Sequence, residues 1–115
     1  MQLPIQLTYR GIEPSEFVAE YARKKAEKLD ALYAHINACR VVIEAPSKHH
    51  RHGAAYRVRI DFTVPGHDLV AGAHTGSGVG HEDLYAAIDD AFDDAQRVLK
   101  RHVDRLREPR RTTAE

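Results

Sequence analysis

The segment YRVRIDFTV, residues 56–64, alternates apolar and charged or polar side chains along its whole length. The apolar positions are Tyr56, Val58, Ile60, Phe62 and Val64. The positions between them are Arg57, Arg59, Asp61 and Thr63. This period of two predicts a β-strand with one buried face and one solvated face. A sheet built on such a strand needs a covering layer, which the rest of the chain must supply.

Three other stretches have the pattern of strands. Residues 2–9 alternate with Leu3, Ile5, Leu7 and Tyr9 on one side, and ACRVVIEA, residues 38–45, alternates in the same way. The turn sequence VPGHD leads into a short apolar stretch, LVAGA, at residues 69–73. We therefore expect four strands in all.

Two segments carry apolar residues at helical spacing. Residues 13–35 contain Pro14, which suits a first helical turn, and have the stripe Val18, Ala22, Ala26, Leu29 and Tyr33. The last helical segment has the stripe Leu84, Ile88, Ala91, Phe92, Ala95, Leu99, His102, Val103 and Leu106. The order β-α-β-β-β-α predicts a single α+β domain, a four-stranded sheet with both helices packed on one face and Arg57 and Arg59 on the other. We expect this domain to span residues 1–107 and residues 108–115 to form a disordered tail.

Composition restricts the classes of function. The 115 residues include 17 basic and 17 acidic side chains, so the chain lacks the overall positive charge typical of nucleic-acid binders, and any such function must rest on local clusters. The single cysteine, Cys39, excludes an internal disulfide and is in phase with buried strand positions. The N-terminus has no basic leader, and no apolar run approaches the roughly 20 residues of a membrane span. We expect a soluble, cytoplasmic protein.

Four stretches, HEDLYAAID, EKLDALY, CRVVIEAP and VRIDFTVPG, together resemble the ribosome hibernation-promoting factor family, also called the ribosome-associated inhibitor family. The similarity covers residues 3–107 in matching order. It implies a stress or stationary-phase factor that sits in the mRNA and tRNA channel of the small ribosomal subunit, contacts its rRNA and silences translation. It implies no enzymatic activity, no cofactor, no small-molecule substrate and no membrane partner. Longer relatives carry an extension that pairs ribosomes, which is not implied directly here.

The resemblance also implies that basic residues on both helices contact rRNA. The matching region of the first helix has Arg23, Lys24, Lys25 and Lys28, and that of the second has Arg97, Lys100, Arg101 and Arg105, followed by Arg107. On a helical wheel Tyr21, Lys25 and Lys28 form one stripe beside the buried face, from which the amines could cross toward the second helix. The alternative is a solvated face whose lysines pair with Glu20, Glu27 and Asp30.

The second helix departs from the family in its acidic first half. Residues 81–96 contain six carboxylates and no Lys or Arg, whereas residues 97–111 contain seven basic and two acidic residues. The helix dipole favours acid at the N-terminus and base at the C-terminus, but it does not explain Asp93 and Asp94, which lie near the middle. Asp93 could pair with Arg97. Asp94 stands where relatives usually have lysine, so Asp94→Lys should tighten ribosome binding by about 1 kcal/mol.

A second departure is the loop SKHHRHG, which contains Lys48, His49, His50, Arg51 and His52. It could contact RNA, bind a metal ion or form a plain solvated turn, although no cysteine or carboxylate completes a metal site. If it touches RNA, protonation of its imidazoles should raise affinity as the pH falls. The glycine-rich connector HTGSGVG lacks the Lys-Ser or Lys-Thr pair of a nucleotide-binding loop. An alternative function remains, namely a protein-interaction or metal-responsive stress domain with the same fold and little RNA affinity.

Overall fold

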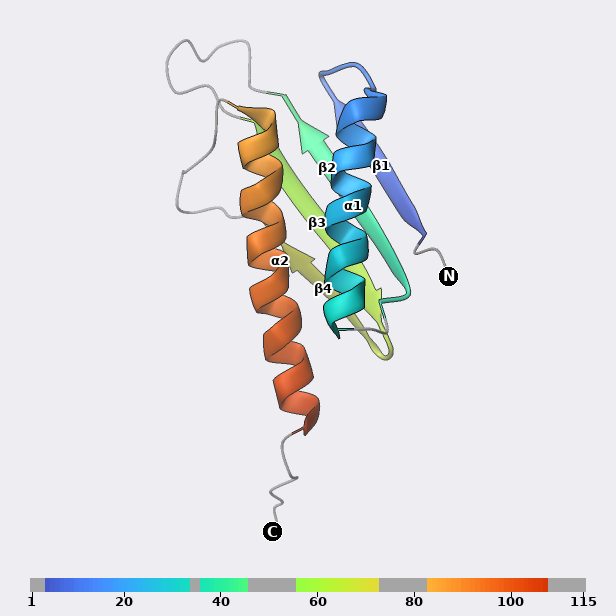
Figure 1. Ribbon diagram of the computed structural model, residues 1–115, viewed down its shortest axis with the longest axis vertical. Coiled ribbons are helices and arrows are strands. Elements are labelled where there is room, and N and C mark those ends of the chain that lie inside the picture. The colour runs from blue at the N-terminus through green and yellow to red at the C-terminus, as the bar shows by residue number, and fades with distance from the viewer. Residues whose placement is uncertain (1–3, 34–35, 46–55, 73–82, 108–115) are drawn as a thin grey trace.

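The computed structural model describes residues 4–33, 36–45, 56–72 and 83–107 (Figure 1). Its elements are β1 Ile5–Arg10, α1 Glu16–Tyr33, β2 Ala38–Glu44, β3 Arg57–Val64, β4 His67–Ala71 and α2 Leu84–Arg107. This order is the predicted β-α-β-β-β-α.

The four strands form one sheet in the order β1-β2-β3-β4. β1 and β2 are parallel and are connected through α1, while β2, β3 and β4 are joined by antiparallel pairing. Both helices lie side by side over one face of this sheet (Figure 1). The predicted α+β fold is therefore confirmed.

The core lies between the sheet and the two helices. Its largest fully buried side chains are Phe62, Ile43, Ile60, Ile88, Leu99 and Val41. The predicted stripe of α1 is buried from Val18 to Leu29, and most of the α2 stripe is buried as well. Leu106 is the exception, since it is 68% exposed. The last turns of α2 extend beyond the sheet (Figure 1).

The other face of the sheet is polar at β3, as predicted. Arg57 and Arg59 are exposed there, and the Nε of Arg59 donates a hydrogen bond of 3.0 Å to the Oδ1 of Asp61. Cys39 is buried on the helix side, and burial, together with the charge of Asp61, raises the pKa of its thiol to about 12. A thiol that stays protonated is a poor nucleophile, which agrees with its predicted place in the core.

Both helices begin with a side-chain cap. α1 begins at Glu16, and the Oγ of Ser15 accepts a hydrogen bond of 3.3 Å from the backbone N–H of Val18. Pro14, which we expected in the first helical turn, therefore lies before the helix, and Ser15 is the residue that satisfies a free amide of the first turn. At α2, the Oδ1 of Asp83 accepts a bond of 3.1 Å from the N–H of Tyr85.

The fourth strand begins earlier than predicted. It covers His67–Ala71 rather than residues 69–73, because the turn at Gly66, with φ of +81°, pairs His67 directly with Val64. Gly72 also has φ of +81° and follows the last strand residue. This left-handed conformation is costly for other residues and turns the chain out of the sheet.

Candidate nucleic-acid interface

The basic residues of α1 do not share one face. Lys24 and Lys28 are exposed, and Lys25 is partly covered where α1 meets α2. Arg23 is also exposed, but it lies two positions from Lys25, which is roughly 160° around a helix. The structure therefore brings Lys25 and Lys28 together and leaves Arg23 on another side of α1.

Lys25 crosses to α2, as the helical wheel suggested. Its Nζ lies 2.8 Å from the Oδ1 of Asp89, which also accepts a hydrogen bond of 2.5 Å from the hydroxyl of Tyr21. The same Nζ lies 5.5 Å from the centre of the Tyr21 ring, and this ring meets that of Tyr85 edge to face at 4.9 Å. Asp89 thus joins the two helices through two donors from α1.

These contacts shift the acidity of all three groups. The hydrogen bond to Asp89 raises the pKa of Lys25 and is also the main cause that raises the pKa of Tyr21. Burial works to raise the pKa of Asp89, but the bonds from Lys25 and Tyr21 outweigh it and the pKa is lowered. Lys25 is therefore a paired cation at neutral pH, and its partner is not one of the carboxylates of its own helix that the sequence suggested.

Lys25 and Lys28 line a shallow hollow between the helices. Its volume is about 80 Å³, and it is bordered by Lys25, Lys28, Leu29, Leu32, Phe92, Asp93 and Gln96. Asp93 faces this hollow and is not the partner of Arg97, so the predicted pairing was wrong. The Nη2 of Arg97 instead lies 3.2 Å from the Oδ1 of Asp94.

Asp94 has a second contact, which sequence reasoning missed. Its Oδ2 accepts a hydrogen bond of 2.9 Å from the backbone N–H of Gly72, the residue that follows β4. A backbone amide that leaves a sheet needs another acceptor, and Asp94 provides it. This contact explains a carboxylate in the middle of the helix, where the dipole does not.

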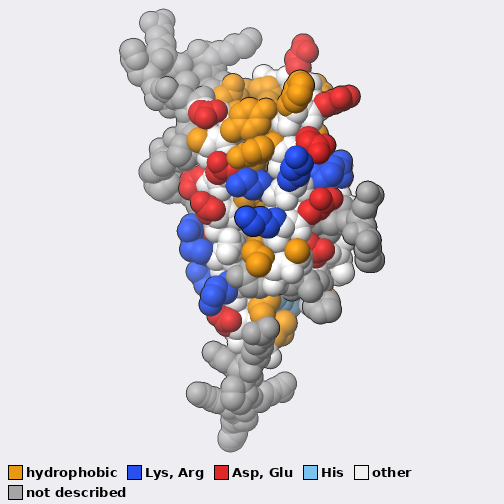
Figure 2. Space-filling view, viewed as in Figure 1, with side chains coloured by type: hydrophobic (Ala, Val, Ile, Leu, Met, Phe, Trp, Pro, Cys, Tyr) orange, Lys and Arg blue, Asp and Glu red, His pale blue; other side chains and the backbone are white. Residues whose placement is uncertain are grey.

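The basic residues of the second half of α2 are all exposed: Arg97, Lys100, Arg101 and Arg105. Figure 2 shows Lys and Arg side chains gathered over the middle of α1 and along the lower part of α2, with acidic side chains between and above them. Lys100 is paired with Asp104, with Nζ and Oδ2 2.9 Å apart. Arg101 and Arg105 have no carboxylate within ion-pair distance among the described residues.

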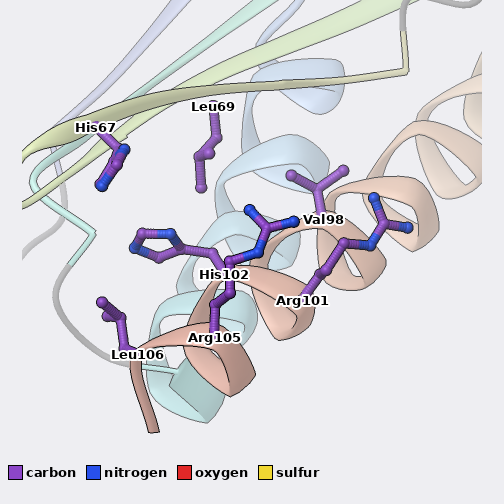
Figure 3. A pocket seen from close by; sticks show the side chains of 7 residues that line it. All are labelled: His67, Leu69, Val98, Arg101, His102, Arg105 and Leu106. Atoms are coloured by element: carbon purple, nitrogen blue, oxygen red, sulfur yellow. The ribbon is translucent and has the colours of Figure 1, made fainter. Parts of the chain in front are cut away.

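Arg101 and Arg105 border a cavity on the β4 side of α2. Its volume is about 350 Å³, and Figure 3 shows its lining residues His67, Leu69, Val98, Arg101, His102, Arg105 and Leu106. The rings of His67 and His102 meet at 4.9 Å with an angle of 69° between their planes. His102 is only 9% exposed, and burial, followed by the charges of His67 and Arg105, lowers its pKa. The sequence feature that pointed to a buried histidine here was the position of His102 within the apolar stripe of the last helix.

Several predicted features lie outside the described residues. These are the loop residues Lys48, His49, His50, Arg51 and His52, the connector at 74–80 and the tail at 108–115. Among the residues that are described, no group of three His, Cys, Asp or Glu side chains could hold a metal ion. Within the same residues, neither helix is long and apolar enough to cross a bilayer.

Comparison with known proteins gives consistent matches over nearly the whole chain. A family model described as Sigma 54 modulation protein / S30EA ribosomal protein matches residues 5–107. A ribosome hibernation promotion factor of Deinococcus radiodurans is 31% identical over 91% of this chain. The chain spans only 51% of that relative's length. It spans 99% of the ribosome hibernation promoting factor of Salmonella typhimurium, to which it is 28% identical.

Solved structures share the fold. A ribosomal subunit interface protein from Coxiella burnetii superposes with a TM-score of 0.71 at 18% identity, covering 89% of this chain and 99% of its own. The N-terminal domain of Protein Y from Thermus thermophilus gives a TM-score of 0.65 at 28% identity, with the same coverage. Both agree with the α+β arrangement described above.

Proposed function

Because the chain belongs to the Sigma 54 modulation protein / S30EA ribosomal protein family, we propose that it binds the small ribosomal subunit and silences translation. Its relatives named ribosome hibernation promotion or promoting factors support this role. The protein acts in the cytoplasm as a binding factor rather than as an enzyme. The observation that carries the proposal is the pair of basic helical segments on one side of the sheet.

The proposed contact surface runs across the outer side of both helices. Lys24 and Lys28 supply it from α1, and Arg97, Lys100 and Arg101 supply it from α2. Phosphate contacts of this kind release condensed counterions, so binding should weaken steeply as salt rises. A formally neutral protein can bind RNA in this way, because the field near a surface depends on its local charges rather than on the total.

Lys25, Arg97 and Lys100 already have carboxylate partners within the protein. Such exposed pairs contribute only about 0.2–1 kcal/mol each, so a phosphate can replace the carboxylate at small cost. The pairs orient the cations before binding. In the competing function, a domain that binds protein partners, the same ion pairs would stay intact and the affinity for RNA would be low.

Ribosome co-sedimentation at several salt concentrations tests the proposal. Lys28→Glu combined with Lys100→Glu should weaken binding roughly tenfold or more and reduce the salt slope by about two. Arg57→Glu removes the same kind of charge from the opposite face of the sheet and should bind like the unmodified protein. Failure of the unmodified protein to bind small subunits even at low salt would favour the protein-interaction alternative.

A further inference from the structure

The cavity between the second half of α2 and β4 combines two kinds of lining. Leu69, Val98 and Leu106 give it apolar walls, and Leu106 is largely exposed at its edge. Every polar side chain on the wall carries an imidazole or a guanidinium, and no carboxylate lines the cavity within the described part of the chain. A ligand that fits must therefore pair an apolar, flat or compact body with a negative charge.

The histidine pair narrows the class of ligand. His102 points from α2 toward His67 on β4 (Figure 3). Both imidazole rings line the cavity together with its apolar side chains. Unstacked nucleobases pack against histidine rings and arginine planes in single-stranded RNA complexes. The volume of about 350 Å³ is at the lower end of the roughly 300–1,000 Å³ of small-ligand sites. That space suits one nucleotide and not a longer segment.

We propose that this cavity binds a single nucleotide, with the base between the imidazole pair and the apolar wall and the phosphate on Arg101 and Arg105. The proposal rests on the proposed ribosome binding for its biological source, an unstacked nucleotide of the rRNA. Arginine suits the role because its planar fork can hold a phosphate with two parallel hydrogen bonds. Unlike Arg97 and Lys100, these two arginines have no carboxylate partner among the described residues to displace.

Binding should depend on pH in a defined direction. The charged and titratable groups that face His102 are His67 from β4 and Arg101 and Arg105 from α2, and none on the cavity wall comes from α1 or β3 within the described residues. The charges of His67 and Arg105 disfavour a proton on His102, and the negative charge of an added phosphate opposes that effect. Affinity for a phosphodiester, whose own charge is constant in this range, should therefore rise as the pH falls from about 7.5 to 5.5.

Titrations of the full chain followed by NMR of the histidine ring protons provide the test. At pH 7, adenosine 5′-monophosphate should shift the His67 and His102 signals. Ribose 5-phosphate, which lacks the base, and adenosine, which lacks the phosphate, should each bind at least about tenfold more weakly, as expected for the loss of one charge-assisted or stacking contact. A short single-stranded oligoadenylate should compete with the mononucleotide, whereas the same sequence in a duplex should not.

Single-residue variants test which side chains bind the nucleotide. Arg105→Gln should weaken the binding of adenosine 5′-monophosphate about tenfold, and His102→Leu should remove the pH dependence of oligoadenylate binding. Arg57→Gln, on the other face of the sheet, should change neither. Equal affinity for ribose 5-phosphate and the nucleotide would overturn the proposal in favour of a simple anion site. Binding of the mononucleotide without competition by the oligoadenylate would also overturn it, because the source would then be a free nucleotide.

The test is separable from that of ribosome binding. If the nucleotide proposal alone fails, Arg105→Gln will not affect the mononucleotide, while Lys28→Glu with Lys100→Glu still weakens co-sedimentation. If the ribosome proposal alone fails, the unmodified protein will bind the oligoadenylate but will not co-sediment with small subunits.

Discussion

The two halves of α2 carry opposite charges and use them differently. In the acidic half, Asp89 accepts bonds from two α1 side chains, and Asp94 accepts the N–H of Gly72 at the end of β4. In the basic half, Arg101 and Arg105 border an open cavity and have no carboxylate partner among the described residues. The acidic half contacts α1 and the end of β4, whereas we propose that the basic half contacts RNA. The two halves therefore allow stability and the proposed recognition to be tested separately.

The largest effect on stability is expected at Gly72, whose N–H donates to Asp94 in the acidic half of α2. A Cβ on Gly72 would lie 2.6 Å from the carbonyl oxygen of Val58 and 2.9 Å from the Cβ of Ala91, in a backbone with φ of +81°. Strain and overpacking together should cost Gly72→Ala about 3 kcal/mol of unfolding free energy. Gly66→Ala is the matched control, because it has the same φ and nothing within 4 Å.

Gly66→Ala should lose only about 1 kcal/mol, which is the conformational cost alone. Urea unfolding of both variants, followed by circular dichroism, measures the difference. Equal losses would mean that α2 does not press on Gly72, and the contrast between the two halves of the helix would lose its main structural support.

The next effect concerns Asp94 itself. Asp94→Ala leaves the N–H of Gly72 without its acceptor and should lower the unfolding free energy by about 1–2 kcal/mol. Asp93→Ala removes the neighbouring carboxylate, which is exposed at the hollow between the helices, and should change it by less than about 0.5 kcal/mol. Similar losses in the same urea experiment would show that charge, and not the bond to Gly72, is the common cause.

Asp94→Lys combines two opposing effects. The added cation should strengthen ribosome binding by about 1 kcal/mol, and the lost bond to Gly72 should destabilise the fold. Affinity must therefore be compared with the folded fraction measured at the same temperature. No gain in affinity per folded molecule at low salt would favour a structural role for Asp94 or a different docking face.

The sequence was sufficient for the fold because its patterns are regular. Alternation in β3 and the helical stripes gave the order of the elements, and a wheel placed Lys25 toward α2. The helix and strand ends were less accurate, because the capping role of Ser15 and the turn at Gly66 depend on local hydrogen bonds and dihedral angles. From the sequence alone, several neighbouring residues could end a helix or a strand, so its exact last residue is not determined.

The candidate site was only partly accessible to sequence reasoning. The basic positions could be named, but their partners could not, since Asp94 and Gly72 are far apart in the chain and meet only through β4. The His67 and His102 pair was missed for the same reason. The histidine cluster that did attract attention, at residues 49–52, lies outside the described residues.

A smaller effect should appear in the basic half. Burial, then the charges of His67 and Arg105, holds the pKa of His102 below its ordinary value near 6.5. The unfolded chain therefore takes up this proton first, so the stability contributed by neutral His102 is present above about pH 6.5 and is lost as the pH falls. His102→Leu should flatten the stability curve between about pH 7 and 5.

His67→Asn provides the control for this prediction. It removes one neighbouring charge but leaves His102 buried, and burial is the larger cause of the lowered pKa. Most of the pH dependence should therefore remain in urea unfolding of this variant. If His67→Asn and His102→Leu flatten the curve equally, repulsion between the two rings, and not burial, controls the protonation of the cavity.

The smallest effect is expected at Asp89, although it joins the two helices. Its pKa is lowered because the bonds from Lys25 and Tyr21 outweigh burial, so its stabilising contribution is complete above the ordinary value near 3.9 and is lost as the pH falls through the lowered one. Its side chain is 44% exposed and that of Lys25 is 33% exposed. Solvent screening should therefore limit the effect of Asp89→Asn at pH 7 to about 0.2–1 kcal/mol.

Asparagine can still accept the hydrogen bond from Tyr21 but cannot form the ion pair with Lys25, so the variant isolates the charge. The difference from the unmodified protein should shrink in about 1 M salt, where the Debye length is near 3 Å, and should vanish as the pH falls below the lowered pKa. Asp93→Asn alters an exposed carboxylate on the same side of α2 whose charge acts on Lys25 more weakly than that of Asp89, so it should show a smaller dependence on salt. A loss that persists in high salt would mean that Asp89 acts through packing, and that the acidic half of α2 holds the helices by shape more than by charge.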